Sequence, residues 1–135
     1  METLAMILPS CLRYEARIEK QMLLAGLQIK QSAKVLLSAR QAKELCNQDG
    51  LAKVLSSSSV KVYCLKGKNA VKGWQDLMGP EVPNSSDAKW WQLRCKFANG
   101  LAYSQGNPDN GFYGSATPDD AERDICLMRK WGYMK

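Results

Sequence analysis

The sequence contains no histidine, and its five cysteines are odd in number and widely spaced. No two of them form a Cys-x-x-Cys pair of the kind that zinc sites use. Without histidine or paired cysteines, the chain lacks the usual ligands of a zinc centre. We therefore expect no metal site, and we expect reduced cysteines that pack as small apolar side chains. They are Cys11, Cys46, Cys64, Cys95 and Cys126.

Long apolar runs and a basic leader are also missing. No apolar run approaches the ~20 residues that a membrane-spanning helix needs. The first ten residues carry an acid, Glu2, where a secretory signal would carry basic residues, and their apolar run is short. We therefore expect an intracellular, cytoplasmic protein that does not span or bind a membrane.

Acidic residues are absent between Gly50 and Gln75, where the chain carries five lysines. The net charge of the whole chain is +6. Such a stretch is either a solvated face of the fold or a basic surface for an acidic partner, and the sequence leaves both readings open. The lysines are Lys53, Lys61, Lys66, Lys68 and Lys72.

The patterns that are present predict one globular domain of alternating strands and helices. The length of 135 residues, the apolar content of 45% and the charged content of 24% are ordinary for such a domain. Apolar or alternating runs predict strands over residues 3–8, 28–37, 60–65 and 111–113. Helical periodicity predicts helices over 12–25, 38–46, 70–78 and from 118 onward, with one further turn at 51–55. This order predicts an α/β or α+β fold, and a ferredoxin-like βαββαβ antiparallel sheet with covering helices accommodates it.

Several boundaries carry recognisable signals. Ser38 with Gln41 forms a capping box, and Thr117 followed by Pro118 opens the last helix. We expect loops at the serine run of residues 56–59, at 81–87 and at 99–110. Of the adjacent Trp90 and Trp91, we expect one to pack in the core and the other to be exposed.

Four motifs occur in order along the chain. They are Thr-Leu-Ala-Met-Ile-Leu-Pro from Thr3, Leu-Ala-Gly-Leu from Leu24, Asn-Ala-Val from Asn69 with Leu-Met-Gly-Pro from Leu77, and Tyr-Gly-Ser-x-Thr-Pro from Tyr113. Together they resemble the nucleoside diphosphate kinase family over nearly all of residues 3–128. The resemblance implies a single domain of that fold over residues 1–128, followed by a basic, aromatic tail over 129–135.

The departures from the family pattern fall where phosphoryl transfer would take place. Tyr113 stands at the position of the nucleophilic histidine, and a phenol with a pKa of ~10 is a poor phosphate carrier at neutral pH. Leu8 stands in place of a phosphate-contacting lysine, Gln75 in place of an arginine, and Glu81 in place of a threonine. The helical hairpin that stacks on the base looks truncated and offers no Tyr or Phe over residues 46–51. The resemblance therefore implies a protein that is not an enzyme, needs no cofactor and binds nucleotide poorly.

Some family positions are retained, and each has a second, structural reading. Asn110, Ser115 and Asp124 match the supporting residues of the site, with Asp124 in place of a glutamate. Arg94 matches one phosphate-binding arginine, or it is a surface ion-pair residue. Tyr113 is also readable as a packed residue whose hydroxyl finds a partner, and Asp124 as part of a solvated helix face with the two acids that cap the helix, Asp119 and Asp120.

Three functional hypotheses follow. The first is a non-catalytic structural and interaction module. Degenerate members of the family occur in axonemes of cilia, so the resemblance implies a ciliary, microtubule-associated or other cytoskeletal role. Its partners would be tubulin or axonemal proteins. The second is a nucleic-acid-binding module in which lysines contact phosphates and a tryptophan stacks on bases, although no RNP-like pattern is present. The third is a residual nucleotide-binding protein or an enzyme that uses another residue. The candidate interaction residues are Lys61, Lys66, Lys68, Lys72, Trp90 and Trp91.

Overall fold

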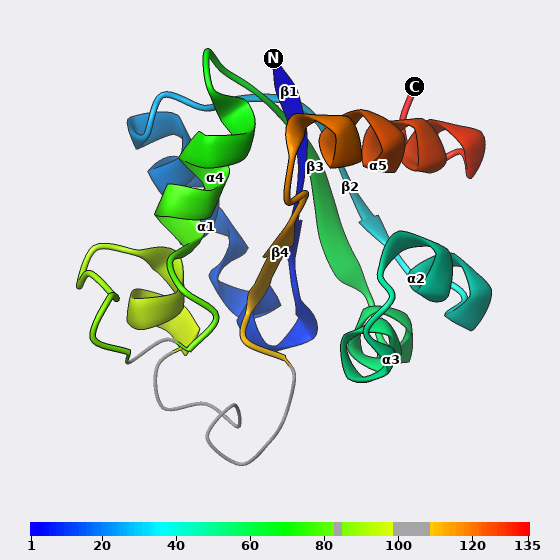
Figure 1. Cartoon of the computed structure of the whole chain (residues 1–135), viewed down its shortest axis with the longest axis horizontal. Coiled ribbons are helices and arrows are strands. Elements are labelled where there is room, and N and C mark those ends of the chain that lie inside the picture. The colour runs from blue at the N-terminus through cyan, green and yellow to red at the C-terminus, as the bar shows by residue number, and fades with distance from the viewer. Residues whose placement is uncertain (83–84, 99–108) are drawn as a thin grey trace.

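The computed structural model describes residues 1–82, 85–98 and 109–135. In this part of the chain a four-stranded sheet has the order β2-β3-β1-β4, and every neighbouring pair of strands is antiparallel (Figure 1). This confirms the predicted ferredoxin-like α+β sheet with covering helices. The strands are β1 (Glu2–Ile7), β2 (Gln28–Val35), β3 (Val60–Lys66) and β4 (Phe112–Gly114).

Helices cover both faces of the sheet, so its central strands are buried on both sides. α1 (Glu15–Leu24) and α4 (Ala70–Met78) pack on one face, and α2 (Ala39–Leu45), α3 (Asp49–Ser57) and α5 (Pro118–Lys130) pack on the other (Figure 1). Successive residues of a strand point to opposite faces. Ala5 and Ile7 of β1 therefore lie in a first apolar cluster, between the sheet and the helices α1 and α4. Leu4 and Met6 lie in a second apolar cluster, between the sheet and the helices α2, α3 and α5.

Two helix starts agree with the sequence signals, and one predicted helix is divided. The Ser38–Gln41 capping box is present, and the Thr117 hydroxyl accepts a hydrogen bond of 3.1 Å from the Asp120 amide. The helix expected over 12–25 begins instead as a 3₁₀ segment, η1 (Pro9–Tyr14), and continues as α1. Pro9 stands at the start of η1, where its missing N–H group leaves no hydrogen bond unmade.

The serine run was wrongly assigned to a loop in its first half. α3 extends to Ser57, because the serine hydroxyls bond back to carbonyls one turn earlier. Ser56 Oγ donates to Ala52 O at 3.1 Å, and Ser57 Oγ donates to Val54 O at 2.9 Å. The described residues of 81–87 form no helix or strand, in keeping with the expected loop. Residues 99–108 of the expected loop at 99–110 lie outside the described residues.

The chain end folds back onto the domain. α5 runs to Lys130, and Met134 beyond it is buried in the second apolar cluster. The Tyr133 hydroxyl donates to Gln41 Oε1 at 2.9 Å, and the Lys135 amide donates to Gln31 Oε1 at 2.8 Å. These contacts tie the basic, aromatic residues 129–135 to α2 and β2. Within residues 1–82, 85–98 and 109–135, no helix is both long enough and apolar enough to cross a bilayer.

Candidate functional site

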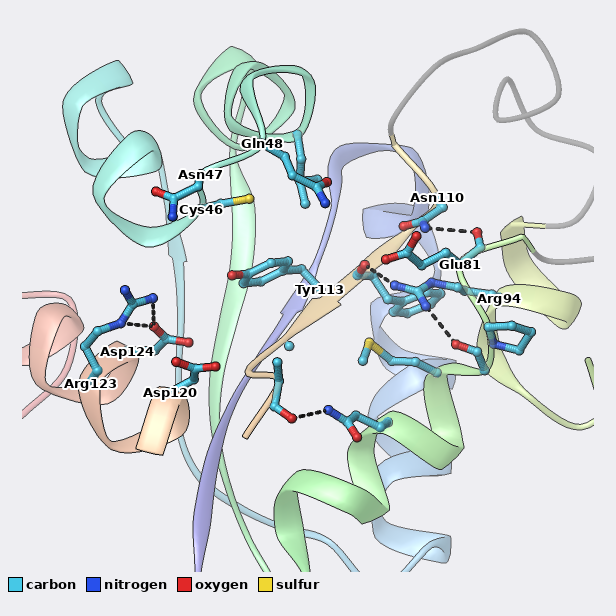
Figure 2. A pocket seen from close by; sticks show the side chains of 18 residues that line it. Cys46, Asn47, Gln48, Glu81, Arg94, Asn110, Tyr113, Asp120, Arg123 and Asp124 are labelled. Atoms are coloured by element: carbon cyan, nitrogen blue, oxygen red, sulfur yellow. Dashed lines mark hydrogen bonds and ion pairs between the residues drawn. The ribbon is translucent and has the colours of Figure 1, made fainter. Parts of the chain in front are cut away.

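A cleft of about 940 Å³ opens beside β4. The α2–α3 hairpin forms one wall, and the start of α5 together with the segment after α4 forms the others (Figure 2). Its polar and charged lining residues are Asn47, Gln48, Gln75, Glu81, Arg94, Asn110, Tyr113, Asp120, Arg123 and Asp124. The structure thus brings together three of the retained family positions, Arg94, Asn110 and Asp124, around Tyr113.

Tyr113 lies in the middle of the cleft, held there by the packing of β4 (Figure 2). Trp74 donates its indole N–H to the Tyr113 carbonyl at 3.1 Å and so fixes the strand against α4. The Tyr113 hydroxyl faces the hairpin and donates to the Leu45 carbonyl at 3.4 Å. Burial, followed by the negative charge of Asp124, raises the pKa of Tyr113. The phenol is therefore neutral at physiological pH.

Arg94 is not the surface ion-pair residue that one reading proposed. It begins a π-helical turn, η2 (Arg94–Ala98), and only 7% of its surface is exposed. Its guanidinium donates to the Gly79 carbonyl at 2.7 Å and to the Phe112 carbonyl at 2.9 Å. The side chain therefore joins the end of α4 to β4, because a buried guanidinium needs acceptors and these two carbonyls supply them.

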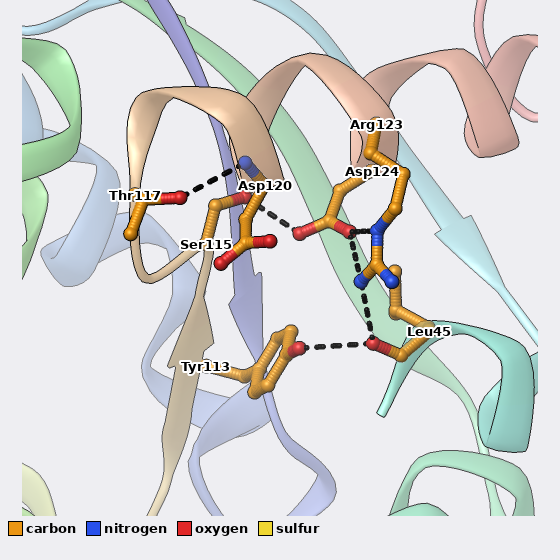
Figure 3. A network of polar contacts seen from close by, with 7 residues as sticks. All are labelled: Leu45, Tyr113, Ser115, Thr117, Asp120, Arg123 and Asp124. Carbon is orange, nitrogen blue, oxygen red and sulfur yellow. Dashed lines mark hydrogen bonds and ion pairs between the residues drawn. The ribbon is translucent and has the colours of Figure 1, made fainter. Parts of the chain in front are cut away.

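Asp124 anchors a network between α5, β4 and the hairpin (Figure 3). The buried Ser115 hydroxyl donates to Asp124 Oδ2 at 2.8 Å, and Arg123 donates to Asp124 Oδ1 from Nη2 at 2.9 Å. Arg123 also donates to the Leu45 carbonyl at 3.2 Å. Burial raises the pKa of Asp124, although the bonds from Ser115 and Arg123 act in the opposite direction. Asp124 is 1% exposed, so it does not belong to a solvated face.

Arg123 was missed by the sequence reasoning. Asp120, Arg123 and Asp124 have the spacing i, i+3, i+4, which places them on one face of a helix. That spacing is visible in the sequence and could have identified Arg123 as a member of the site.

The substituted positions behave differently from phosphate ligands. Leu8 is fully buried in the apolar core, so the position matched to a lysine does not line the cleft. Gln75 donates its amide group to the carbonyls of Ser115 and Ala116 at 3.2 and 2.8 Å. Asn110 donates to the Glu81 carbonyl at 3.0 Å, and this bond fixes the segment after α4.

The hairpin expected to be truncated is present as two helices of seven and nine residues. Its cleft-facing residues are Cys46, Asn47, Gln48 and Leu51. The described residues of this wall offer no aromatic ring for stacking, as the sequence indicated.

The lysine stretch does not form one uniform basic face. The side chain of Lys61 is only 18% exposed and contacts Glu15 at 2.8 Å and Glu19 at 3.7 Å, so it is paired within the domain and is not an open basic group of the surface. The reason is that strand alternation turns Lys61 toward α1, which carries both acids. Lys66 and Lys68 are exposed, and the exposed Lys72 pairs with Asp76 at 3.4 Å.

Both adjacent tryptophans are exposed, Trp90 by 78% and Trp91 by 42%. The expectation that one of them packs in the core is therefore wrong. They belong to a turn over residues 90–91, and Trp74 on α4 supplies the buried indole instead. Among the described residues, no group of three or more Cys, Asp or Glu side chains is placed to hold a metal ion.

The sheet order and the cleft at its β4 edge define a ferredoxin-like fold with a site between a helical hairpin and the last helix. Within that class, the chain belongs to the nucleoside diphosphate kinase family, because the family model of that description matches residues 1–130.

Solved structures of low sequence identity share the fold. A nucleoside diphosphate kinase of Aquifex aeolicus is 20% identical, with a TM-score of 0.82 over 94% of this chain and 93% of that one. The enzyme of Pyrobaculum aerophilum is 22% identical, with a TM-score of 0.81 over 93% of each chain. The Halobacterium salinarum enzyme, solved in complex with CDP, is 22% identical, with a TM-score of 0.79 over 94% of this chain and 86% of that one.

A longer protein also contains a similar segment. Thioredoxin domain-containing protein 3 of Mus musculus is 29% identical over 109 residues, which are 75% of this chain and 18% of that protein. The chain thus spans less than a fifth of the length of this relative.

Proposed function

We propose that this domain has lost phosphoryl transfer and serves as a protein-interaction module in a larger assembly. The observation that carries the proposal is the state of the cleft around Tyr113. The neutral phenol of Tyr113 stands where the resemblance puts the nucleophile, Arg94 donates to two backbone carbonyls, and Arg123 is paired with Asp124. Phosphoryl transfer needs an activated nucleophile and cations directed at the phosphates.

Two further points support an interaction role. The matched segment of the mouse relative is a minor part of a much longer chain, as expected for a domain that works as one module among several. Degenerate members of the family occur in axonemes, and the exposed Lys66, Lys68 and Lys72 suit the acidic surface of tubulin. The proposed setting is cytoplasmic, on microtubules or in a ciliary axoneme.

The catalytic half of the proposal is tested by a coupled assay with ATP and a second nucleoside diphosphate. We expect no turnover from the protein, and none from Tyr113→His, because that change restores the imidazole without the cations. An active family member serves as the positive control. Turnover by the unchanged protein that disappears in Asn110→Ala would overturn the proposal.

The interaction half is tested by co-sedimentation with microtubules. Lys66→Glu, Lys68→Glu and Lys72→Glu together should abolish pelleting at physiological salt. The matched control changes the same number of exposed lysines elsewhere, Lys20, Lys43 and Lys130, and therefore alters the net charge equally. Equal pelleting by both triple variants would exclude this surface as the microtubule contact.

A second candidate, nucleic-acid binding, is favoured by the large exposed area of Trp90 beside Lys89. Stacking on Trp90 would quench its fluorescence, and phosphate contacts would make the affinity fall steeply with salt. A titration with single-stranded oligonucleotides at two salt concentrations distinguishes this candidate from the first.

A further inference from the structure

The cleft presents two carboxylates near its opening, that of Glu81 and that of Asp120 in the first turn of α5. The Glu81 carbonyl accepts from Asn110 and the Asp120 amide donates to Thr117, while the Asp120 carboxylate acts on Arg123 through its charge alone. Across residues 1–82, 85–98 and 109–135, neither carboxylate has a hydrogen bond or an ion pair. Both line the cleft, one on each side of Tyr113 (Figure 2).

The guanidinium groups of the cleft, in contrast, already donate hydrogen bonds to the protein. Arg94 donates to the carbonyls of Gly79 and Phe112, and Arg123 donates to Asp124 and to the Leu45 carbonyl. The lining holds three carboxylates against two guanidinium groups, which leaves one net negative charge. A ligand rich in phosphate would therefore meet a site of the same sign, whereas a cation would meet the opposite sign.

The remaining cleft groups also suit a cation. Gln75 and Asn110 use their amide N–H groups on backbone carbonyls, so each lining residue keeps its amide oxygen as a further acceptor. The ring of Tyr113 lies between Glu81 and Asp120, where its face can contact a positive charge (Figure 2).

The type of cation follows from how these groups are spread. No group of three Cys, Asp or Glu side chains in the described part of the chain converges closely enough to bind a metal ion. Acceptors separated by an aromatic ring fit an extended organic cation, and the volume of about 940 Å³ leaves ample room for one.

We propose that this cleft binds a lysine or arginine side chain from a basic segment of a protein partner. The cleft would thus bind a basic segment, whereas the exposed lysines would bind an acidic partner. The inference rests on the proposed function, because it requires a cleft that is not filled by nucleotide. We prefer a protein side chain to a free amine because Glu81 is exposed, so a partner polypeptide that lies across the cleft can reach its carboxylate.

The test uses a fluorescein-labelled peptide, Gly-Ser-Arg-Lys-Arg-Ser-Gly, and a neutral analogue in which glutamine replaces each basic residue. Fluorescence anisotropy should show binding of the basic peptide only. Changing Glu81→Gln and Asp120→Asn together should weaken binding by about tenfold or more, because each removes a charge-assisted contact. The matched control, Asp87→Asn with Glu122→Gln, removes two exposed acids outside the cleft and should change the affinity by less than about twofold.

A second pair of variants tests the ring. Tyr113→Phe keeps the aromatic face and should bind the peptide nearly as well as the unchanged protein, while Tyr113→Leu should bind about fivefold more weakly. Far-UV circular dichroism checks that each variant is folded.

Three outcomes would overturn the inference. They are equal binding of the basic and neutral peptides, equal weakening by the cleft and control pairs, and binding of spermine that is as tight as the peptide and equally dependent on Glu81 and Asp120. Competition separates this failure from that of the proposed function. Displacement of the peptide by magnesium ATP would mean that the cleft still takes nucleotide, whereas loss of peptide binding without ATP binding would leave the proposed function standing.

Discussion

The two faces of β4 serve different purposes. On one face Phe112 and Gly114 pack against the fully buried Trp74, whose ring meets that of Phe112 edge-on with centroids 6.1 Å apart. On the other face Tyr113 points into the open cleft. The packed face fixes where the strand lies, and the cleft face decides which chemistry is available there. A change at Tyr113 can therefore alter the chemistry and leave the fold intact.

The strongest test of the packed face is Gly114→Ala. An added Cβ would lie 2.4 Å from Trp74 Cδ1, and the indole cannot move away without losing its hydrogen bond to the Tyr113 carbonyl. We expect the free energy of unfolding in urea to fall by about 3 kcal/mol, at the upper end of the usual range for an overpacked core. In the control, Gly73→Ala within α4, the added Cβ meets only Leu27 Cδ2 at 3.4 Å. We expect the control to change the free energy of unfolding by less than about 1 kcal/mol, and to increase it, because alanine has a higher helix propensity than glycine. Equal effects would show that β4 is not held by Trp74.

The cleft face should show a smaller, pH-dependent effect in Arg123→Met. This change leaves the buried Asp124 carboxylate without its cation, and because Arg123 is half exposed we expect a loss of only about 1.5 kcal/mol at neutral pH. Arg40→Met, at an exposed position of α2, is the control and should be nearly neutral.

The pH dependence follows from the raised pKa of Asp124. Because the folded state holds this proton more tightly than the unfolded state, whose pKa is near 3.8, the contribution of Asp124 to stability falls as the pH rises from 3.8 through the raised pKa. Arg123→Met raises that pKa further, so its stability should fall more steeply with pH. The difference between the two proteins should shrink on acidification, since protonated Asp124 needs no cation. A difference that stays constant with pH would assign the loss to Arg123 packing instead.

At the surface, Lys61→Met should reduce stability by about 1 kcal/mol or less, because the lysine is partly buried between Glu15 and Glu19. Lys72→Met removes a pair that is exposed on both sides and should change stability by about 0.3 kcal/mol. Thermal unfolding measures both changes. Microtubule pelleting should fall in Lys72→Met and should stay unchanged in Lys61→Met. A loss of pelleting in Lys61→Met alone would restore it as an interaction residue.

Local features of the sequence predicted much of the fold. The unbroken apolar run at β1 indicated a strand buried on both faces, and the Ser38–Gln41 and Thr117 signals located two helix starts. Such signals depend on residues within a few positions of one another, so a single sequence contains them. The extent of α3 was missed because serine hydroxyls can bond to either helical or loop backbone.

The surroundings of the site residues could not be predicted in the same way. Arg94 is buried because carbonyls of Gly79 and Phe112, from two other elements, converge on it. Lys61 is shielded by acids of α1 that are more than forty residues away in the chain. These environments are made by tertiary contacts, which periodicity and capping patterns do not encode.

A similarly small effect is expected at Trp90, which is 78% exposed and therefore contributes little apolar burial. Trp90→Ala should change the free energy of unfolding by less than about 0.5 kcal/mol, in contrast to the buried Trp74. Urea unfolding followed by far-UV circular dichroism measures this without relying on the deleted fluorophore. If Trp90 belongs to a partner interface, Trp90→Ala should weaken binding of the partner and leave the free energy of unfolding unchanged, because the indole contacts the partner and not the domain. A large loss of stability would instead mean that Trp90 packs against the domain, and it would remove Trp90 from the candidate interaction residues.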